Sequence, residues 1–522
     1  MRMRRLARTL AITAAISLGA ARAGSAQSLS EADVNTIVLQ AINEASARGS
    51  PATIAVVDRV GNVLTLTQMA GAPTTVRPTT DRGITGGLEN LEVPAVPAAA
   101  AAVSKAITGA YLSSNGNAFT TRTANQIIQE HFDPGVEFNP GGPLFGVQFS
   151  QLACSDFIRT AAVGPGRTRP GPHAAPLGLA ADSGGLPVYK NGILAGGIGV
   201  VTKNVYSFDP NIFDVDVDND EVIAIAGVTG YAAPASIQAY NIAINGLTLR
   251  YTDATTANLA ASVSASGSFT PMPPIPGIFP GTLSGHTAIA GTTYGSSDGA
   301  SGIVPDGTFG PLLYPGTSQR AFVFVGAKHR VRYQPRAGLV PAGEMITAAE
   351  AQGLVTSALN IAFMARAAIR EPLGSFAQVT VTVVDRDGNV LAEARTPDAP
   401  IFGADVSRQK ARSATFFSRP DTAARISAIS LPTTSTDTGT FADYIARSQE
   451  LIGPGAFSDG TAWSEVAAGL VARPFYPDGI DGNPPGSLSV PFATHWSPFS
   501  TGLQTDLIVP DVMAFLMDKS KP

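Results

Sequence analysis

The feature that most limits how this chain can fold is a stretch of sequence that occurs twice. Residues 56–73 are VVDRVGNVLTLTQMAGAP, and residues 383–400 are VVDRDGNVLAEARTPDAP. The two stretches align without a gap and share Val-Val-Asp-Arg-x-Gly-Asn-Val-Leu at the front and Ala-Pro at the back. A long internal match of this kind predicts two copies of one structural unit.

Each copy predicts a β-hairpin. In the first copy, TIAVVD (53–58) and VLTLTQ (63–68) are rich in β-branched residues, and the turn between them contains Gly61 and Asn62. Gly and Asn tolerate the positive φ angles that tight hairpin turns require. The second copy has the same order, with strands predicted over 377–385 and 390–395.

The sequence also predicts a helix before each hairpin. Apolar residues recur at helical spacing over 28–49 and 346–369. Ser30 is suited to cap the first of these helices, and Thr347 with Glu350 forms a capping-box pair at the start of the second.

Further similarities follow each hairpin. SKAITGAYLSS (104–114) and QKARSATFFSR (409–419) both predict a helix that carries a Lys-Ala pair. In the first copy, LPVYKNGILAGGIGVV (186–201) then has two apolar runs around Asn191-Gly192, which is a strong hairpin signal. In the second copy the corresponding region is less clear and resembles a loop.

The sequence between the copies has a different composition. Residues 251–320 contain only four charged residues and are rich in Gly, Ser, Thr, Ala and Pro. Two β-like segments lie at the edges of this region, at 240–253 and 321–333. We therefore predict a β-rich insertion with long loops over 241–340, between a first module at 27–240 and a second at 341–522.

The first 26 residues have the pattern of a signal peptide. Four arginines precede an apolar run at about 10–20, and Gly24-Ser25-Ala26 offers a cleavage site. The alternative is a membrane anchor, but the run is shorter than the roughly 20 residues that a bilayer needs. The sequence thus predicts export to the periplasm or the extracellular space, with no membrane span after cleavage.

Charge and cysteine content narrow the function further. Cleavage removes five arginines and no acid, so the formal net charge changes from −5 to −10. Such an acidic protein has no basic surface for nucleic acid. Cys154 is the single cysteine, which excludes an intrachain disulfide and covalent attachment of c-type haem. It is expected to be a small buried residue, with a catalytic thiol as the alternative.

Several of these motifs together resemble the GlcG/HbpS-like haem-binding (haem-degrading) family. The stretches that carry the resemblance are AVVDRVGNVL, QMAGAP, SKAITGAY and GLPVYKNGILAGGIGVV, which together span most of 30–203. Residues 347–420 carry it in the second copy. At the strand end, small members usually have Arg-Met-Asp-Gly-Ala, whereas this chain has Gln68-Met69-Ala70-Gly71-Ala72 and Arg395-Thr396-Pro397-Asp398-Ala399.

The resemblance implies an α+β fold with two profilin-like modules, each an antiparallel sheet flanked by helices. Members are often oligomeric and some bind haem. Two modules in one chain would then pack like the subunits of a homodimer, and homo-oligomers through module surfaces are possible partners. The implied ligand is a small molecule of the haem or tetrapyrrole class.

Candidate haem-binding residues follow from what iron and propionates require. Iron takes an axial ligand such as His, Met, Cys or Tyr in an apolar pocket. Of five histidines, His131 in QEHFDPG and His495 in THWSPF lie inside the family-like modules with aromatic residues nearby. Met69 is a further candidate, with core packing as its alternative. Lys105 and Lys410 could hold a propionate, or could be solvated helix residues.

Two other patterns have weaker implications. The run FDVDVDNDE contains Asp214, Asp216 and Asp218, whose oxygens could bind Ca²⁺, or form a solvated turn before a helix. Gly295 to Gly299 matches the G-x-S-x-G pattern of serine hydrolases, but the sequence that follows cannot form the required helix.

From these observations we expect an exported, non-catalytic haem- or tetrapyrrole-binding protein. One alternative is an enzyme or accessory factor that acts on a small organic acid. Another is a structural or interaction protein that has lost its ligand. Fold similarity does not decide among these functions.

Overall fold

The computed structural model of the protein describes most of the chain. The described residues are 27–79, 97–129, 132, 142–144, 147, 150–152, 155, 170–207, 209, 211–273, 275, 288–339, 345–430 and 440–464. The predicted signal peptide, Cys154, His131 and His495 lie outside these residues. Within the described part of the chain, helices are too short or too polar to cross a bilayer.

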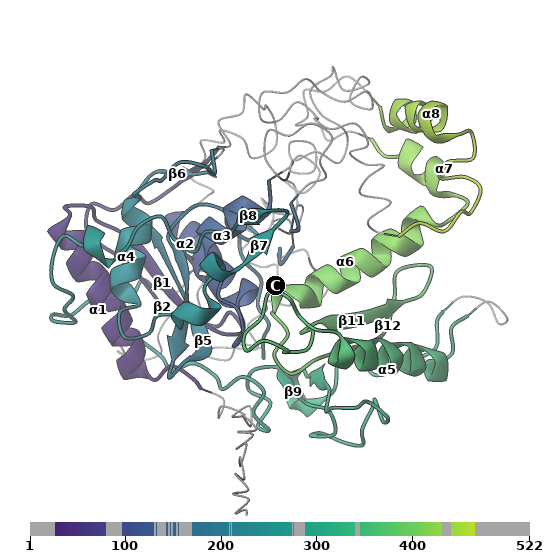
Figure 1. Ribbon diagram of the computed structural model, residues 1–522, viewed down its shortest axis with the longest axis horizontal. Helices are drawn as coiled ribbons and strands as arrows, with labels where there is room; N and C mark the ends of the chain where they lie inside the picture. The colour runs from purple at the N-terminus through teal and green to yellow at the C-terminus, as the bar shows by residue number, and fades with distance from the viewer. Residues whose placement is uncertain are drawn as a thin grey trace, which may run out of the picture.

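Module 1 is a four-stranded antiparallel sheet with helices on both faces (Figure 1). The strand order is β2-β1-β5-β4. The strands are β1 (Thr53–Asp58), β2 (Val63–Gln68), β4 (Gly185–Lys190) and β5 (Ile193–Val201). The helices are α1 (Glu31–Ala47), α2 (Ala98–Leu112), α3 (Thr121–Ile127) and α4 (Asn219–Gly227).

The local predictions for module 1 are confirmed. Ser30 caps α1 in a capping box with Asp33. The hairpin turn at Asn191-Gly192 has φ angles of 54° and 78°. Successive side chains of β1 point to opposite faces of the sheet, so the core has two parts. Ala55 and Val57 pack with α2 on one face, and Ile54 and Val56 pack with α1 and α4 on the other.

The Gly-Gly-Ile-Gly sequence of β5 lets a helix lie directly on the sheet. A Cβ atom on Gly197 would lie 2.1 Å from the carbonyl oxygen of Ala106, and one on Gly199 would lie 2.0 Å from that of Ala102. Both distances are far below van der Waals contact, so only Gly fits at these two positions. The facing part of α2 is rich in Ala and fully buried, which completes this close packing.

Module 2 is also an antiparallel sheet with helices on both faces, but its strand order is β11-β12-β10-β9. The strands are β9 (Ile303–Pro305), β10 (Phe322–Phe324), β11 (Thr380–Val384) and β12 (Val390–Arg395). Its helices are α5 (Ala348–Met364) and α6 (Phe402–Phe417), followed by α7 (Thr422–Ser427) and α8 (Phe441–Ile452). In Figure 1, α7 and α8 lie away from the sheet, beyond the end of α6.

Two expectations for this half need correction. The capping box of Thr347 and Glu350 is present, but α5 ends at Met364, before the expected residue 369. Beyond it the chain turns back, and the Ala367 N–H bonds the Ser375 carbonyl, so the residues that lead to β11 cannot continue the helix.

The second correction concerns the insertion over 241–340, which is not a separate element. Its strands β9 and β10 belong to the sheet of module 2. The same region also contacts module 1, because Met272 and Ile289 donate backbone hydrogen bonds to the carbonyls of Leu66 and Leu64 on β2. Short pairs complete the described strands: β3 (Arg77–Pro78) with β6 (Val205–Tyr206), and β7 (Ala243–Ile244) with β8 (Leu247–Thr248).

The two modules share a hydrophobic core. Ile401, which precedes α6, and Ala404 of α6 belong to the same buried cluster as α2 of module 1. Ile303 and Phe324, from β9 and β10, join it as well. Figure 1 shows the modules side by side, with the amino end of α6 directed at module 1.

Candidate functional site

The repeated Asp-Arg-x-Gly-Asn stretch forms the same turn in both modules. The Asp58 carboxylate accepts hydrogen bonds from the Val60 and Asn62 backbone N–H groups, each at 3.0 Å. Asp385 accepts the corresponding bonds from Asp387 and Asn389 at 3.0 and 2.9 Å. These carboxylates fix the hairpin turns, so the most similar part of the two stretches has a structural role.

The residue after Asp58 connects the modules. Arg59 forms an ion pair with Asp398 of module 2 at 2.6 Å, and its guanidinium lies 3.8 Å from the ring centre of Tyr294. The second oxygen of Asp398 accepts a hydrogen bond from the Asn115 N–H at 2.9 Å and lies 3.4 Å from Arg370 Nη1. A polar cluster is therefore enclosed where the modules meet.

This junction lacks the symmetry of a homodimer. In a two-fold interface, each contact between two positions occurs a second time with the positions exchanged. In the alignment, Arg386 corresponds to Arg59, and Gly71 corresponds to Asp398. Arg386 is exposed, and its carbonyl accepts a hydrogen bond from Arg419 of its own module. The expected packing as homodimer subunits is therefore wrong for the contacts at this junction.

Lys105 is buried in module 1 and fully engaged. Its Nζ lies 2.8 Å from both Asp182 and Asp220 and donates to the Val200 carbonyl at 3.0 Å. Burial lowers the pKa of Lys105, but the two carboxylates outweigh burial and raise the pKa above its usual value. Since an ammonium group has three N–H donors, this arrangement leaves none for a ligand.

Lys410 has a different environment, although it belongs to the matching Lys-Ala pair. It is exposed on α6. The buried cation of this helix is Arg408, which bonds both oxygens of Glu393 at 2.6 and 3.0 Å. The ligand role predicted for Lys410 stays a prediction, and the two Lys-Ala pairs do not occupy equivalent environments.

Met69 has a packing role in the structure. It is half-buried against the core between the sheet and α1. Its sulfur accepts a hydrogen bond from the Ala52 N–H at 3.4 Å. The thioether therefore faces the protein interior, as its core-packing alternative predicted.

The two described histidines, His173 and His329, both contact other side chains. His173 is bonded through Nε2 to Asn62 at 2.7 Å, and burial lowers its pKa, so the ring is neutral and engaged. His329 is exposed and stacks on Phe309 with 4.3 Å between ring centres. Both described rings are therefore engaged by protein groups, His173 by Asn62 and His329 by Phe309.

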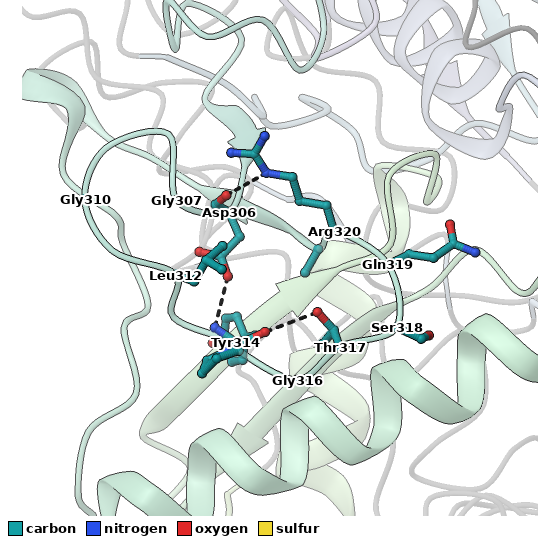
Figure 2. Close-up of a pocket in the computed structure, with 12 residues that line it drawn as sticks. Asp306, Gly307, Gly310, Leu312, Tyr314, Gly316, Thr317, Ser318, Gln319 and Arg320 are labelled. Atoms are coloured by element: carbon teal, nitrogen blue, oxygen red, sulfur yellow. Dashed lines mark hydrogen bonds between the residues drawn. The ribbon is translucent and has the colours of Figure 1, made fainter.

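A pocket of about 520 Å³ lies in the loop between β9 and β10 (Figure 2). Glycines, Tyr314 and the polar residues from Thr317 to Arg320 line it, but no His, Met or Cys. The buried Asp306 carboxylate accepts the Leu313 and Tyr314 N–H groups, while its carbonyl accepts Arg320 Nε at 2.8 Å. Since the Tyr314 hydroxyl bonds the Glu393 carbonyl at 3.2 Å, this pocket offers no free ligand for iron.

The acidic run gathers carboxylates, but not the expected set. Oxygens of Asp209, Asp214 and Asp216 lie within 4.8 Å of one another. Asp218 instead caps α4 and bonds Lys203. Asp209 was not among the ligands predicted from the sequence, and its carboxylate lies 3.1 Å from Arg122 Nη1. Arg122 already neutralises part of this cluster, and Ca²⁺ binding stays a prediction.

Comparison with known proteins places the family match in module 2. The model of a family described as haem-degrading protein HbpS-like matches residues 355–457, from within α5 to just beyond α8. No curated protein matches the chain. The fold is that of an α+β protein with antiparallel sheets flanked by helices, as the resemblance implied.

Three solved structures are similar to parts of the chain. A PduOC–haem complex has 18% identity over 39% of this chain and 94% of its own, with a TM-score of 0.23. Klebsiella pneumoniae ORFY has 17% identity over 40% and 92%, with a TM-score of 0.22. A double mutant of Streptomyces reticuli HbpS has 18% identity over 43% and 97%, with a TM-score of 0.21.

Proposed function

We propose that this protein is exported and binds haem or a related tetrapyrrole without catalysing its turnover. The observation that carries the proposal is the match of residues 355–457 to the HbpS-like family, whose description refers to haem. The signal-peptide pattern of residues 1–26 supports export.

Binding is proposed in preference to degradation because two buried cations of the described residues, Lys105 and Arg408, are engaged in ion pairs. Lys105 is held by Asp182 and Asp220, and Arg408 is held by Glu393. Groups that are held in this way cannot exchange protons with a substrate until their ion pairs break.

His131 and His495 are the proposed iron ligands. The described histidines support this choice indirectly, since His173 is bonded to Asn62 and His329 stacks on Phe309. Both proposed ligands lie in sequence with aromatic neighbours, Phe132 and Trp496, that could pack against a porphyrin face.

Haemin titration of the purified mature protein tests the proposal. A saturable shift of the Soret band is expected, and replacement of His131 or His495 by Ala should change the band or weaken the binding. His329→Ala is the matched control and should leave the titration unchanged. If no saturable shift occurs, haem binding is refuted. Bleaching of the band on addition of a reductant in air would contradict the non-catalytic part of the proposal.

A further inference from the structure

Three buried arginines lie close together where the modules join, and two of them contact one aspartate. Arg59, Arg370 and Arg395 are only 3%, 5% and 0% exposed, respectively. Arg59 and Arg370 face the two oxygens of Asp398, at 2.6 and 3.4 Å. The Tyr294 ring connects the cluster, since the guanidinium carbons of Arg59 and Arg395 lie 3.8 and 5.9 Å from its centre.

Several N–H donors in this cluster have no acceptor among the described residues. Arg395 Nη2 donates to the Ala399 carbonyl, but its Nε and Nη1 are buried without a hydrogen-bond partner. Arg59 Nε is in the same situation. Buried donors in native proteins are nearly always paired, with protein, water or a ligand.

The charges of the cluster are also unbalanced. Among the described residues, Asp398 and Glu393 are the carboxylates with the largest effects on the pKa values of these arginines. Glu393 is already neutralised by two hydrogen bonds from Arg408. Among the described residues of this cluster, three buried guanidinium groups therefore face one carboxylate that is not already neutralised, Asp398, so positive charge exceeds negative charge.

Arginine cannot relieve this excess by losing its proton at ordinary pH. Burial and the neighbouring Arg59 lower the pKa of Arg370 to about 10, which still leaves it charged at neutral pH. The rings of Tyr294 and Phe324 attract the guanidinium groups, but they supply no negative charge. A buried charge without a counter-charge is strongly destabilising.

We propose that Arg59, Arg370 and Arg395 form a binding site for a small oxyanion between the two modules. The ligand class is a short carboxylate or dicarboxylate, or an inorganic phosphate of similar size and charge, because guanidinium groups pair best with such oxygens. Asp398, which is 18% exposed, marks the side of the cluster nearest to solvent. The anion restores the charge balance and accepts the unpaired N–H donors.

The site gives a role to a motif that the haem proposal does not use. Arg395 and Asp398 belong to the strand-end sequence Arg-Thr-Pro-Asp-Ala of module 2, where module 1 has Gln68 and Gly71. Module 1 instead contributes Arg59 from its hairpin turn. The binding site therefore forms once in the molecule, at the junction, and does not depend on any proposed iron ligand.

Anion binding to the haem-free full-length protein tests the proposal. Calorimetric titrations with sodium formate, oxalate and phosphate, at constant ionic strength set by sodium chloride, would measure affinity and distinguish carboxylate from phosphate. Saturable binding of at least one anion is expected. Arg395→Met should weaken it tenfold or more, and Arg425→Met, which removes an exposed arginine of α7, should not change it.

A second variant separates binding from folding. Asp398→Asn removes the one carboxylate that pairs with Arg59 and Arg370, so anion affinity should rise in this variant, whereas a purely structural role predicts no gain. Circular dichroism would confirm that each variant is folded. The proposal is overturned if none of the three anions binds, or if folded Arg395→Met binds as tightly as the wild type. Neither result affects the Soret test of haem binding.

Discussion

The two modules begin with nearly the same hairpin but enclose it differently. In module 1, β1 pairs with β2 on one side and with β5 on the other, and all six of its residues are buried. In module 2, β11 pairs with β12, and all five of its residues remain half-exposed. The hairpin is therefore a local property of the repeated sequence, whereas its burial depends on strands from elsewhere in the chain.

The helices that precede the hairpins show the same contrast. The apolar face of α1 packs on the sheet and on α4. Within the described residues, α5 instead exposes a stripe in which Leu354, Ile361 and Met364 are 50%, 62% and 72% exposed, respectively. Similar local patterns thus produce one enclosed module and one with an exposed apolar surface.

The largest expected effect concerns the two Lys-Ala pairs. Lys105→Met leaves Asp182 and Asp220 buried without their cation, so the free energy of unfolding should fall by about 3–5 kcal/mol. Lys410→Met removes an exposed charge and should change the free energy of unfolding by less than about 0.5 kcal/mol. Denaturant unfolding measures both. Equal losses would show that the two pairs have equivalent environments after all.

The helices provide the next comparison. Ile37→Ala in α1 creates a cavity in a closed core and should lower the free energy of unfolding by about 2–5 kcal/mol. Ile361→Ala in α5 removes a side chain that is already 62% exposed, and should cost less than about 0.5 kcal/mol. A large loss at Ile361, measured in the same way, would mean that the stripe on α5 is covered in solution.

A pH effect should arise from Glu221 in module 1. Burial raises the pKa of Glu221 from 4.5 to about 7, although Arg122 opposes this shift. Between these values the folded protein keeps a proton that the unfolded chain has released, so stability should fall as pH rises, by at most about 3 kcal/mol. Thermal unfolding from pH 4.5 to 7.5 should show this fall, and Glu221→Gln should reduce it. An unchanged slope in the variant would exclude Glu221 as the cause.

The smallest effects should be the same in both modules. Ser30→Ala and Thr347→Ala each remove a helix cap with the same geometry, and each should cost about 1 kcal/mol. A clear difference between the two losses, measured by denaturant unfolding, would show that the caps, like the helices, depend on their module.

The features that the sequence predicted well are those that depend on neighbouring residues. The hairpin turns, the capping boxes and the Asn191-Gly192 turn all involve contacts over a few positions. β10 lies in the β-like segment predicted at 321–333, but its place in the sheet of module 2 was missed, because it pairs with Arg395 far along the chain. β9 was missed because it has only three residues, too few to show alternation.

The polar cluster at the junction was missed for a related reason. Arg59 and Asp398 are separated by 339 positions, and a single sequence gives no signal that they meet. The one available indication was the unusual strand end that contains Arg395 and Asp398. Asp209 was missed in the acidic group because it lies outside the alternating run that drew attention to Asp214 and Asp216.

The path of the chain between the modules has a consequence for biosynthesis. β9 and β10 precede β11 and β12 along the chain, so these two strands of the second sheet leave the ribosome first. The segment that leads to these strands is already fastened to module 1, where Thr292 bonds Asp58 at 2.9 and 2.7 Å and Gly291 bonds the Leu29 carbonyl. Module 1 therefore anchors, in the folded protein, the segment that leads into the first two strands of the second sheet.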